Sequence, residues 1–141
     1  MNLNNFNEDL PHYNLTSSIL GWCFDVINEL GTGLLEAVYK NALCVALQEK
    51  GLRVYLEESL NVYFRGKKGG VYKADIIVEK LAMVELKCCK SLLLEHQAQI
   101  INYLKTANVP AGLLVNFGQK KLEYKRVYHP SHDSVTESIF S

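Results

Sequence analysis

The sequence lacks an excess of charge of either sign, because its 15 Lys and Arg residues balance its 15 Asp and Glu residues. Without an overall positive field, any binding to nucleic acid has to use a local patch. Two basic clusters are candidates: Lys67, Lys68 and Lys73 form one, and Lys120, Lys121, Lys125 and Arg126 form the other. Clustered lysines are also common as solubilising side chains in turns and on edge strands, so both interpretations stay open.

The sequence also lacks an apolar run approaching the ~20 residues that cross a bilayer, so we expect no membrane contact. The polar segment 1–7 does not predict a signal peptide. The four cysteines, Cys23, Cys44, Cys88 and Cys89, show no zinc-site spacing. Cys23 and Cys44 fall on apolar helical faces, where cysteine is usually a small core residue. Free thiols are typical of a reducing compartment, so we expect a cytoplasmic protein.

A chain of 141 residues, 48% of them hydrophobic, suits one domain with a real core. We expect a flexible leader over 1–14, a folded domain over 15–130 and a tail over 131–141. Helical spacing of apolar residues predicts helices over 19–30, 34–50 and 92–107, the first capped by Thr16 or Ser17 and the second ended by Gly51. Runs of β-branched, aromatic and leucine residues predict six strands, over 52–57, 60–65, 74–78, 84–87, 111–117 and 122–128. Lys67-Lys68-Gly69-Gly70 is a turn signal.

The expected element order is therefore α-α-β-β-β-β-α-β-β. A helix that connects strand 84–87 to strand 111–117 indicates that these two strands are parallel neighbours. The fold class is α/β, with a single domain in which a mixed sheet is flanked by helices.

Charged residues interrupt the apolar run Val84-Glu85-Leu86-Lys87. Side chains alternate across a strand, so Glu85 and Lys87 share one face. A hairpin turn centred on Lys80 places Asp75 opposite Glu85. The apolar neighbours indicate inner strands, although a surface ion pair would be the usual explanation of such a pattern. Buried charges are costly unless they pair or hold a metal.

These residue types suit metal-assisted hydrolysis of a phosphodiester bond. Hard cations such as Mg2+ prefer oxygen ligands, and Asp75, Glu85 and the Leu86 backbone carbonyl could supply three. Lys87 could orient the nucleophilic water or stabilise developing negative charge.

Two of the expected helices carry further candidates. Glu36 is in the first turn of helix 34–50, where the helix dipole favours an acid, and it could also reach the metal. Tyr39, three residues on, is its neighbour on one helix face. His96, Gln99 and Tyr103 form a polar stripe on helix 92–107. Such a stripe is most often solvated, but Gln99 could contact a phosphate or a metal-bound water.

Several of these segments together resemble the GxxExxY protein family. The segment Gly33-Leu34-Leu35-Glu36-Ala37-Val38-Tyr39 resembles the signature that names the family, and the remaining blocks follow in order at 74–78, 84–87, 96–105 and 112–118. The family belongs to the PD-(D/E)XK nuclease-like superfamily. The resemblance implies a restriction-endonuclease-like core and a Mg2+-dependent site at Glu36, Asp75, Glu85 and Lys87, with Gln99 accessory.

The leading hypothesis is a small Mg2+-dependent nuclease, with Mn2+ as a substitute cation and DNA as the expected substrate. An enzyme of the same chemistry that acts on RNA is an alternative. A non-catalytic module that binds nucleic acid or protein on the same fold is another, and on that hypothesis the carboxylates and Lys87 form a structural network. Recognition by a homodimer or with a partner protein stays open.

Overall fold

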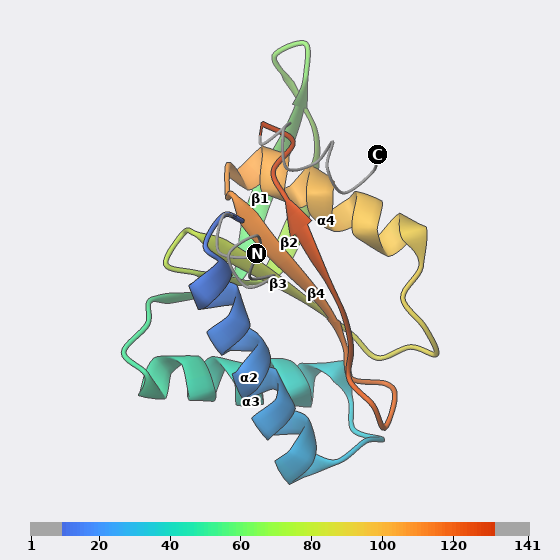
Figure 1. Cartoon of the computed structure of the whole chain (residues 1–141). Helices are drawn as coiled ribbons and strands as arrows, with labels where there is room; N and C mark the ends of the chain where they lie inside the picture. The colour runs from blue at the N-terminus through green and yellow to red at the C-terminus, as the bar shows by residue number, and fades with distance from the viewer. Residues whose placement is uncertain (1–9, 132–141) are drawn as a thin grey trace, which may run out of the picture.

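The computed structural model describes residues 10–131. These residues form a five-stranded sheet of order β1-β2-β3-β4-β5, with helices on both of its faces (Figure 1). The elements are α2 (Tyr13–Leu30), α3 (Glu36–Glu49), β1 (Val54–Phe64), β2 (Lys67–Val78), β3 (Ala82–Lys87), α4 (Leu94–Ala107), β4 (Ala111–Asn116) and β5 (Glu123–Tyr128).

The sheet is mixed, as the sequence predicts. Strands β3 and β4 are parallel and are joined by α4, while the other three pairs are antiparallel. Alternating residues of the inner strands divide the core into two clusters. Val84 and Leu86 pack with α2 and α3 on one face, and Met83 packs with α4 on the other. The predicted parallel pair is thereby confirmed.

The strands before Asp75 differ from the prediction. The expected strands 52–57 and 60–65 are one strand, β1, which pairs with β2 up to its last residue. The expected turn at 67–70 is wrong, because the chain reverses at Arg65 and Gly66, whose φ angles are 50° and 77°. Positive φ at both central residues is the geometry of a tight two-residue hairpin that matches strand twist. The sheet therefore has five strands, and the order of elements along the chain is α-α-β-β-β-α-β-β.

Helix α2 begins earlier than predicted. It starts at Tyr13 after His12, so residues 13 and 14 of the expected leader are helical. Thr16 is not the cap, since its hydroxyl lies inside the helix, 3.1 Å from the Tyr13 carbonyl oxygen. Arg126 of β5 donates hydrogen bonds to the Thr16 and Ser17 hydroxyls and lies over the Tyr13 ring. Arg126 thus packs β5 against α2 and does not belong to a free basic patch.

The remaining expectations concern the thiols, membrane contact and the chain ends. Cys23 and Cys44 are buried as predicted, and all four cysteines are free. In the part of the chain that the structure describes, no helix is long and apolar enough to cross a membrane. The expected leader up to residue 9 and the expected tail from residue 132 lie outside the described residues.

Candidate active site

The candidate site lies where the β1–β2 hairpin twists. The ladder runs from the pair Leu56–Ile76 to the pair Glu58–Ala74 and leaves out Glu57 and Asp75. Glu57 has a φ of 53°, the left-handed region that non-glycine residues rarely adopt. Beyond this point the side chains change faces: Ile76 packs on the α2/α3 side, whereas Ala74 packs on the α4 side. Asp75 therefore lies at the twist, between the two faces of the sheet.

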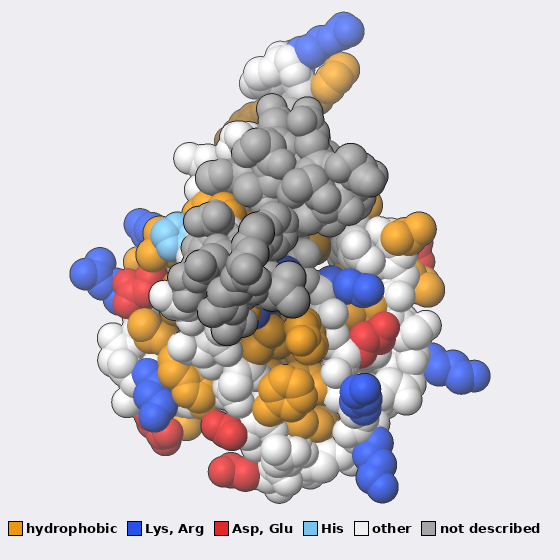
Figure 2. Space-filling view, in the orientation of Figure 1, with side chains coloured by type: hydrophobic (Ala, Val, Ile, Leu, Met, Phe, Trp, Pro, Cys, Tyr) orange, Lys and Arg blue, Asp and Glu red, His pale blue; other side chains and the backbone are white. Residues whose placement is uncertain are grey.

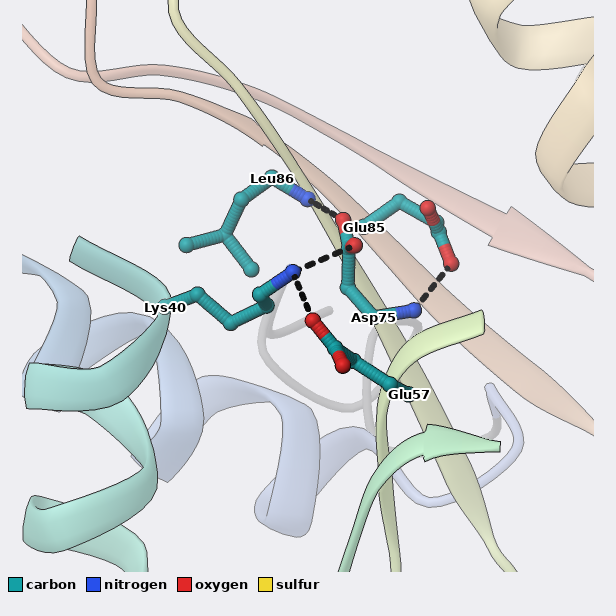
Figure 3. A network of polar contacts seen from close by, with 5 residues as sticks. All are labelled: Lys40, Glu57, Asp75, Glu85 and Leu86. Carbon is teal, nitrogen blue, oxygen red and sulfur yellow. Dashed lines mark hydrogen bonds and ion pairs between the residues drawn. The ribbon is translucent and has the colours of Figure 1, made fainter. Parts of the chain in front are cut away.

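Asp75 and Glu85 hold each other through backbone hydrogen bonds. The register of β2 and β3 is symmetric about Lys80, as predicted, and its last regular pair is Ile76–Val84. Past that pair, the Asp75 N–H donates to Glu85 Oε1 at 2.9 Å, and the Leu86 N–H donates to Asp75 Oδ2 at 2.9 Å (Figure 3). Each carboxylate thus accepts a hydrogen bond from the backbone of the neighbouring strand.

Glu85 is the most buried acidic group of this pair, with 6% of its surface exposed. Burial and, after it, the neighbouring charge of Asp75 raise the pKa of Glu85 to about 8, while the charge of Lys87 acts in the opposite direction. In the metal-free protein at neutral pH, Glu85 is therefore mostly protonated.

A lysine that the sequence analysis missed reaches the site from α3. Lys40 Nζ lies 3.4 Å from Asp75 Oδ1 and 3.0 Å from Glu57 Oε1 (Figure 3). Its side chain is only 12% exposed, and that of Asp75 is 16% exposed. Burial alone would lower the pKa of Lys40, but the hydrogen bond to Glu57 and the charges of Asp75 and Glu57 outweigh it and raise this pKa. Its spacing of four from Glu36 was the available signal, since it places both residues on one helix face.

The other predicted site residues lie around this centre. Glu36 is half-buried at the start of α3, and among the hydrogen bonds and ion pairs of residues 10–131 none joins it to Asp75 or Glu85. Its charge acts on Cys88, whose pKa is raised first by burial and then by Glu36. Lys87 is half-buried at the end of β3.

The predicted polar stripe on α4 is divided in the structure. Gln99 is exposed, whereas Tyr103 is 7% exposed and packs at 4.9 Å, ring to ring, on Tyr72 of β2. Burial raises the pKa of Tyr103, and the charges of Glu85 and Asp75 raise it further. Tyr103 therefore lines the α4 side of the site.

Buried polar contacts fix the elements that carry the site. Tyr39 is fully buried and stacks on Phe117 with the ring centroids 4.9 Å apart. Its hydroxyl donates to the Gly31 carbonyl at 2.6 Å and accepts from the Leu34 N–H at 3.3 Å. Tyr39 thus anchors the start of α3 to the sheet, and the helix in turn directs Lys40 toward Asp75.

The loop after Lys87 is fixed in a similar way. The buried Asn116 side chain accepts from the Cys89 N–H at 3.0 Å and donates to the Cys89 carbonyl at 2.9 Å. Gly118 comes so close to this loop that an added Cβ would lie 2.5 Å from backbone atoms of Cys89. Only glycine allows that approach.

The donor atoms at the centre fit Mg2+ in their chemistry. Asp75 and Glu85 bring carboxylate oxygens from adjacent strands, and Leu86, whose N–H contacts Asp75, presents its carbonyl at the same edge of β3. Over residues 10–131, no group of three or more His, Cys, Asp or Glu side chains is arranged to hold a metal ion. The expected cluster of three carboxylates with Glu36 is thus not formed, and the role of Glu36 as a ligand stays a prediction.

Comparison with protein families gives the class. The family model described as PD-(D/E)XK nuclease superfamily matches residues 13–127. The chain therefore belongs to this superfamily, and its α/β fold is the restriction-endonuclease-like core. Membership of the narrower GxxExxY family stays a prediction. No curated protein sequence matches the chain.

One solved structure shares the fold. The crystal structure of SSO0001 aligns with a TM-score of 0.53 at 20% identity, covering 71% of this chain and 57% of that one. This chain thus spans a little over half the length of that protein. The alkaline exonuclease LHK-Exo from Laribacter hongkongensis, solved also in complex with dAMP, aligns with TM-scores of 0.47 and 0.48 at 12% identity, covering 66% of this chain and 55% of that one.

Proposed function

We propose that the protein is a Mg2+-dependent nuclease that hydrolyses phosphodiester bonds in DNA. The observation that supports this most is the contact between Asp75 and Glu85 on neighbouring inner strands. Burial and mutual repulsion disfavour two such carboxylates, as the raised pKa of Glu85 shows. A divalent cation bound between the two carboxylates would offset this cost, and the chain belongs to a nuclease superfamily.

The residues take distinct roles in this proposal. Asp75, Glu85 and the Leu86 carbonyl hold Mg2+, for which Mn2+ can substitute, and Glu36 adds a ligand from α3. When bound, the cation would supply Lewis-acid chemistry, polarising a phosphate oxygen and easing the deprotonation of water. Lys87 is an ammonium and not a ligand, and it orients the attacking water or stabilises negative charge on the phosphate.

Gln99 has a lesser, accessory role in the proposal. It is exposed on α4, four residues before Tyr103, and so lies on the helix face that borders the site. An exposed amide at this position can donate a hydrogen bond to a substrate phosphate.

A cleavage assay tests the function. The purified protein is incubated with supercoiled, linear, single-stranded and branched DNA and with RNA, in Mg2+, in Mn2+ and in EDTA. We expect cation-dependent cleavage of at least one DNA substrate, and its loss in Asp75→Asn. Asp25→Asn, the same change on the exposed outer side of α2, is the matched control and should cleave like wild type. Absence of cation-dependent cleavage on every substrate refutes the proposal, and cleavage of RNA alone transfers it to RNA.

One observation favours the non-catalytic alternative. Lys40 already neutralises Asp75, and the backbone already uses one oxygen of each carboxylate, so the centre can serve as a structural network. Calorimetric titration separates the two functions. A nuclease site binds Mg2+ or Mn2+ and loses this binding in Asp75→Asn, whereas a purely structural network shows no specific binding in either protein.

A further inference from the structure

The tip of the β1–β2 hairpin carries a local positive charge in a chain whose net charge is zero. We call residues 61–73 the hairpin arm. It contains four basic residues, Arg65, Lys67, Lys68 and Lys73, and no Asp or Glu. All four side chains are exposed. The arm projects from one end of the molecule, away from the helices (Figures 1 and 2). A polyanion is thus the kind of partner that its charge favours.

Exposed aromatic rings lie among these charges. Tyr63 is 61% exposed, Phe64 68% and Tyr72 44%. The Arg65 guanidinium lies 5.0 Å from the centre of the Phe64 ring. Solvation of charged turn residues would explain the lysines, and packing on Tyr103 explains Tyr72, but neither explains the exposed rings of Tyr63 and Phe64. Rings and guanidinium planes interleaved with cations are typical of surfaces that bind unpaired nucleotides.

The base of the arm adjoins the candidate active site on both faces. On the α4 side, Tyr72 packs on Tyr103, which lies near enough to Glu85 and Asp75 to respond to their charges. On the opposite face, Glu57 pairs with Lys40, which lowers the pKa of Glu57. The nearby charge of Lys73 lowers this pKa further. A nucleic-acid strand that lies along the arm from its tip toward its base therefore reaches Asp75 and Glu85.

We propose that the hairpin arm binds a single-stranded segment of the nucleic-acid substrate and leads it to the active site. The four basic side chains contact phosphates, and the exposed rings stack on bases. Bases inside a duplex are already stacked on each other, so a blunt duplex offers the rings nothing to bind. This inference rests on the proposed function, because the bound strand is the substrate of that site.

Binding is measured without cleavage, so that this inference and the proposed function can fail separately. In EDTA, fluorescence anisotropy follows a labelled oligothymidylate of 20 nucleotides and a blunt duplex of equal length, over a series of salt concentrations. Four proteins are compared: wild type, Lys67→Gln/Lys68→Gln, Phe64→Ala, and the control Lys120→Gln/Lys121→Gln. The control makes the same charge change on the second, also exposed, lysine cluster. Circular dichroism checks that each variant is folded.

We expect wild type to bind the single strand more tightly than the duplex. For a single strand, each lost phosphate contact makes the negative slope of log K against log salt less steep by ~0.7. The slope of the arm double variant should therefore be less steep than that of wild type by about 1.4. Loss of one stacked base should weaken binding about 5- to 150-fold in Phe64→Ala. If Phe64→Ala does not fold, Tyr63→Ala takes its place. The control should bind like wild type.

Several results would overturn the inference. These are no binding by wild type at low salt, equal or tighter binding of the duplex, arm variants that bind like wild type, or a larger loss in the control than in the arm variant. Binding through the arm without cleavage in the nuclease assay would sink the proposed function and leave the arm as a binding surface. If the protein cleaves DNA but the arm variants bind like wild type, the proposed function stands and the role of the arm is refuted.

Discussion

Replacing Lys40 by Met removes the ammonium that contacts Asp75 and keeps most of the side chain's apolar stem. The Lys40 Nζ and Asp75 Oδ1 atoms are 3.4 Å apart, and both side chains are largely buried. At an effective dielectric of 20, unit charges at this distance attract by ~5 kcal/mol, an upper bound before solvation is considered. The contact of Lys40 with Glu57 adds little, because the Glu57 side chain is 53% exposed.

The change has opposite effects on stability and on cation binding. Without metal, Asp75 loses its counter-charge, and breaking a buried ion pair costs ~3 kcal/mol or more, which lowers Tm by about 6–12 °C in a chain of this size. A divalent cation at Asp75, however, no longer has to compete with the ammonium. Coupling between close, buried charges is ~1.5 kcal/mol or more, so Mg2+ should bind about tenfold more tightly.

Isothermal titration with Mg2+ and thermal denaturation in EDTA and in Mg2+ test both parts. The control is Lys50→Met, the same change at an exposed lysine just after α3. We expect Lys40→Met to be less stable than the control in EDTA, with a smaller difference in saturating Mg2+. If the folded Lys40→Met protein binds Mg2+ no more tightly than wild type, the cation does not bind at Asp75, and the assignment of this site is refuted.

Three further predictions concern Glu85 and Lys87 of β3. Because the pKa of Glu85 is raised in the folded state to about 8, the metal-free protein should lose stability as pH rises from about 4.5 to about 8. The loss is at most ~1.4 kcal/mol per pH unit, and denaturation of Glu85→Gln should lack this part of the pH dependence. For the same reason, Mg2+ binding should release close to one proton per protein at pH 7 and almost none at pH 9. Titrations in buffers of different ionisation enthalpy measure this release, and equal release at both pH values would contradict the assignment. Lys87→Ala should reduce cleavage ~100-fold or more and leave Mg2+ binding in place, whereas equal loss of both would make Lys87 a structural residue.

The amino-acid sequence by itself determined the centre of the site. Alternation along a strand and a turn about Lys80 are local properties, and they place Asp75 opposite Glu85 without knowledge of the rest of the chain. The helix between strands β3 and β4 likewise predicts their parallel pairing, because a crossover of that length returns the chain in the same direction. The roles of the site residues were inferred from their chemistry and from a family resemblance, and they stay predictions.

The turn of the long hairpin shows where local signals mislead. Two lysines and two glycines at 67–70 are a stronger turn pattern than Arg65-Gly66, but the chain reverses at Arg65-Gly66. A two-residue turn there lets β1 and β2 pair over almost their whole length, and Gly69 is taken up where the register shifts between Val62 and Tyr63. Pairing over many residues outweighs the preference of a few.

Only the tertiary structure decided what surrounds the two carboxylates. Lys40 reaches Asp75 because Tyr39 anchors α3 against Phe117, a contact between residues 78 positions apart in the chain. Glu57 joins them because β1 twists at a left-handed residue, an event that strand alternation does not contain. Sequence periodicity specifies which face of an element a side chain takes, but the partner across the gap depends on how helix and sheet dock, which the whole core decides.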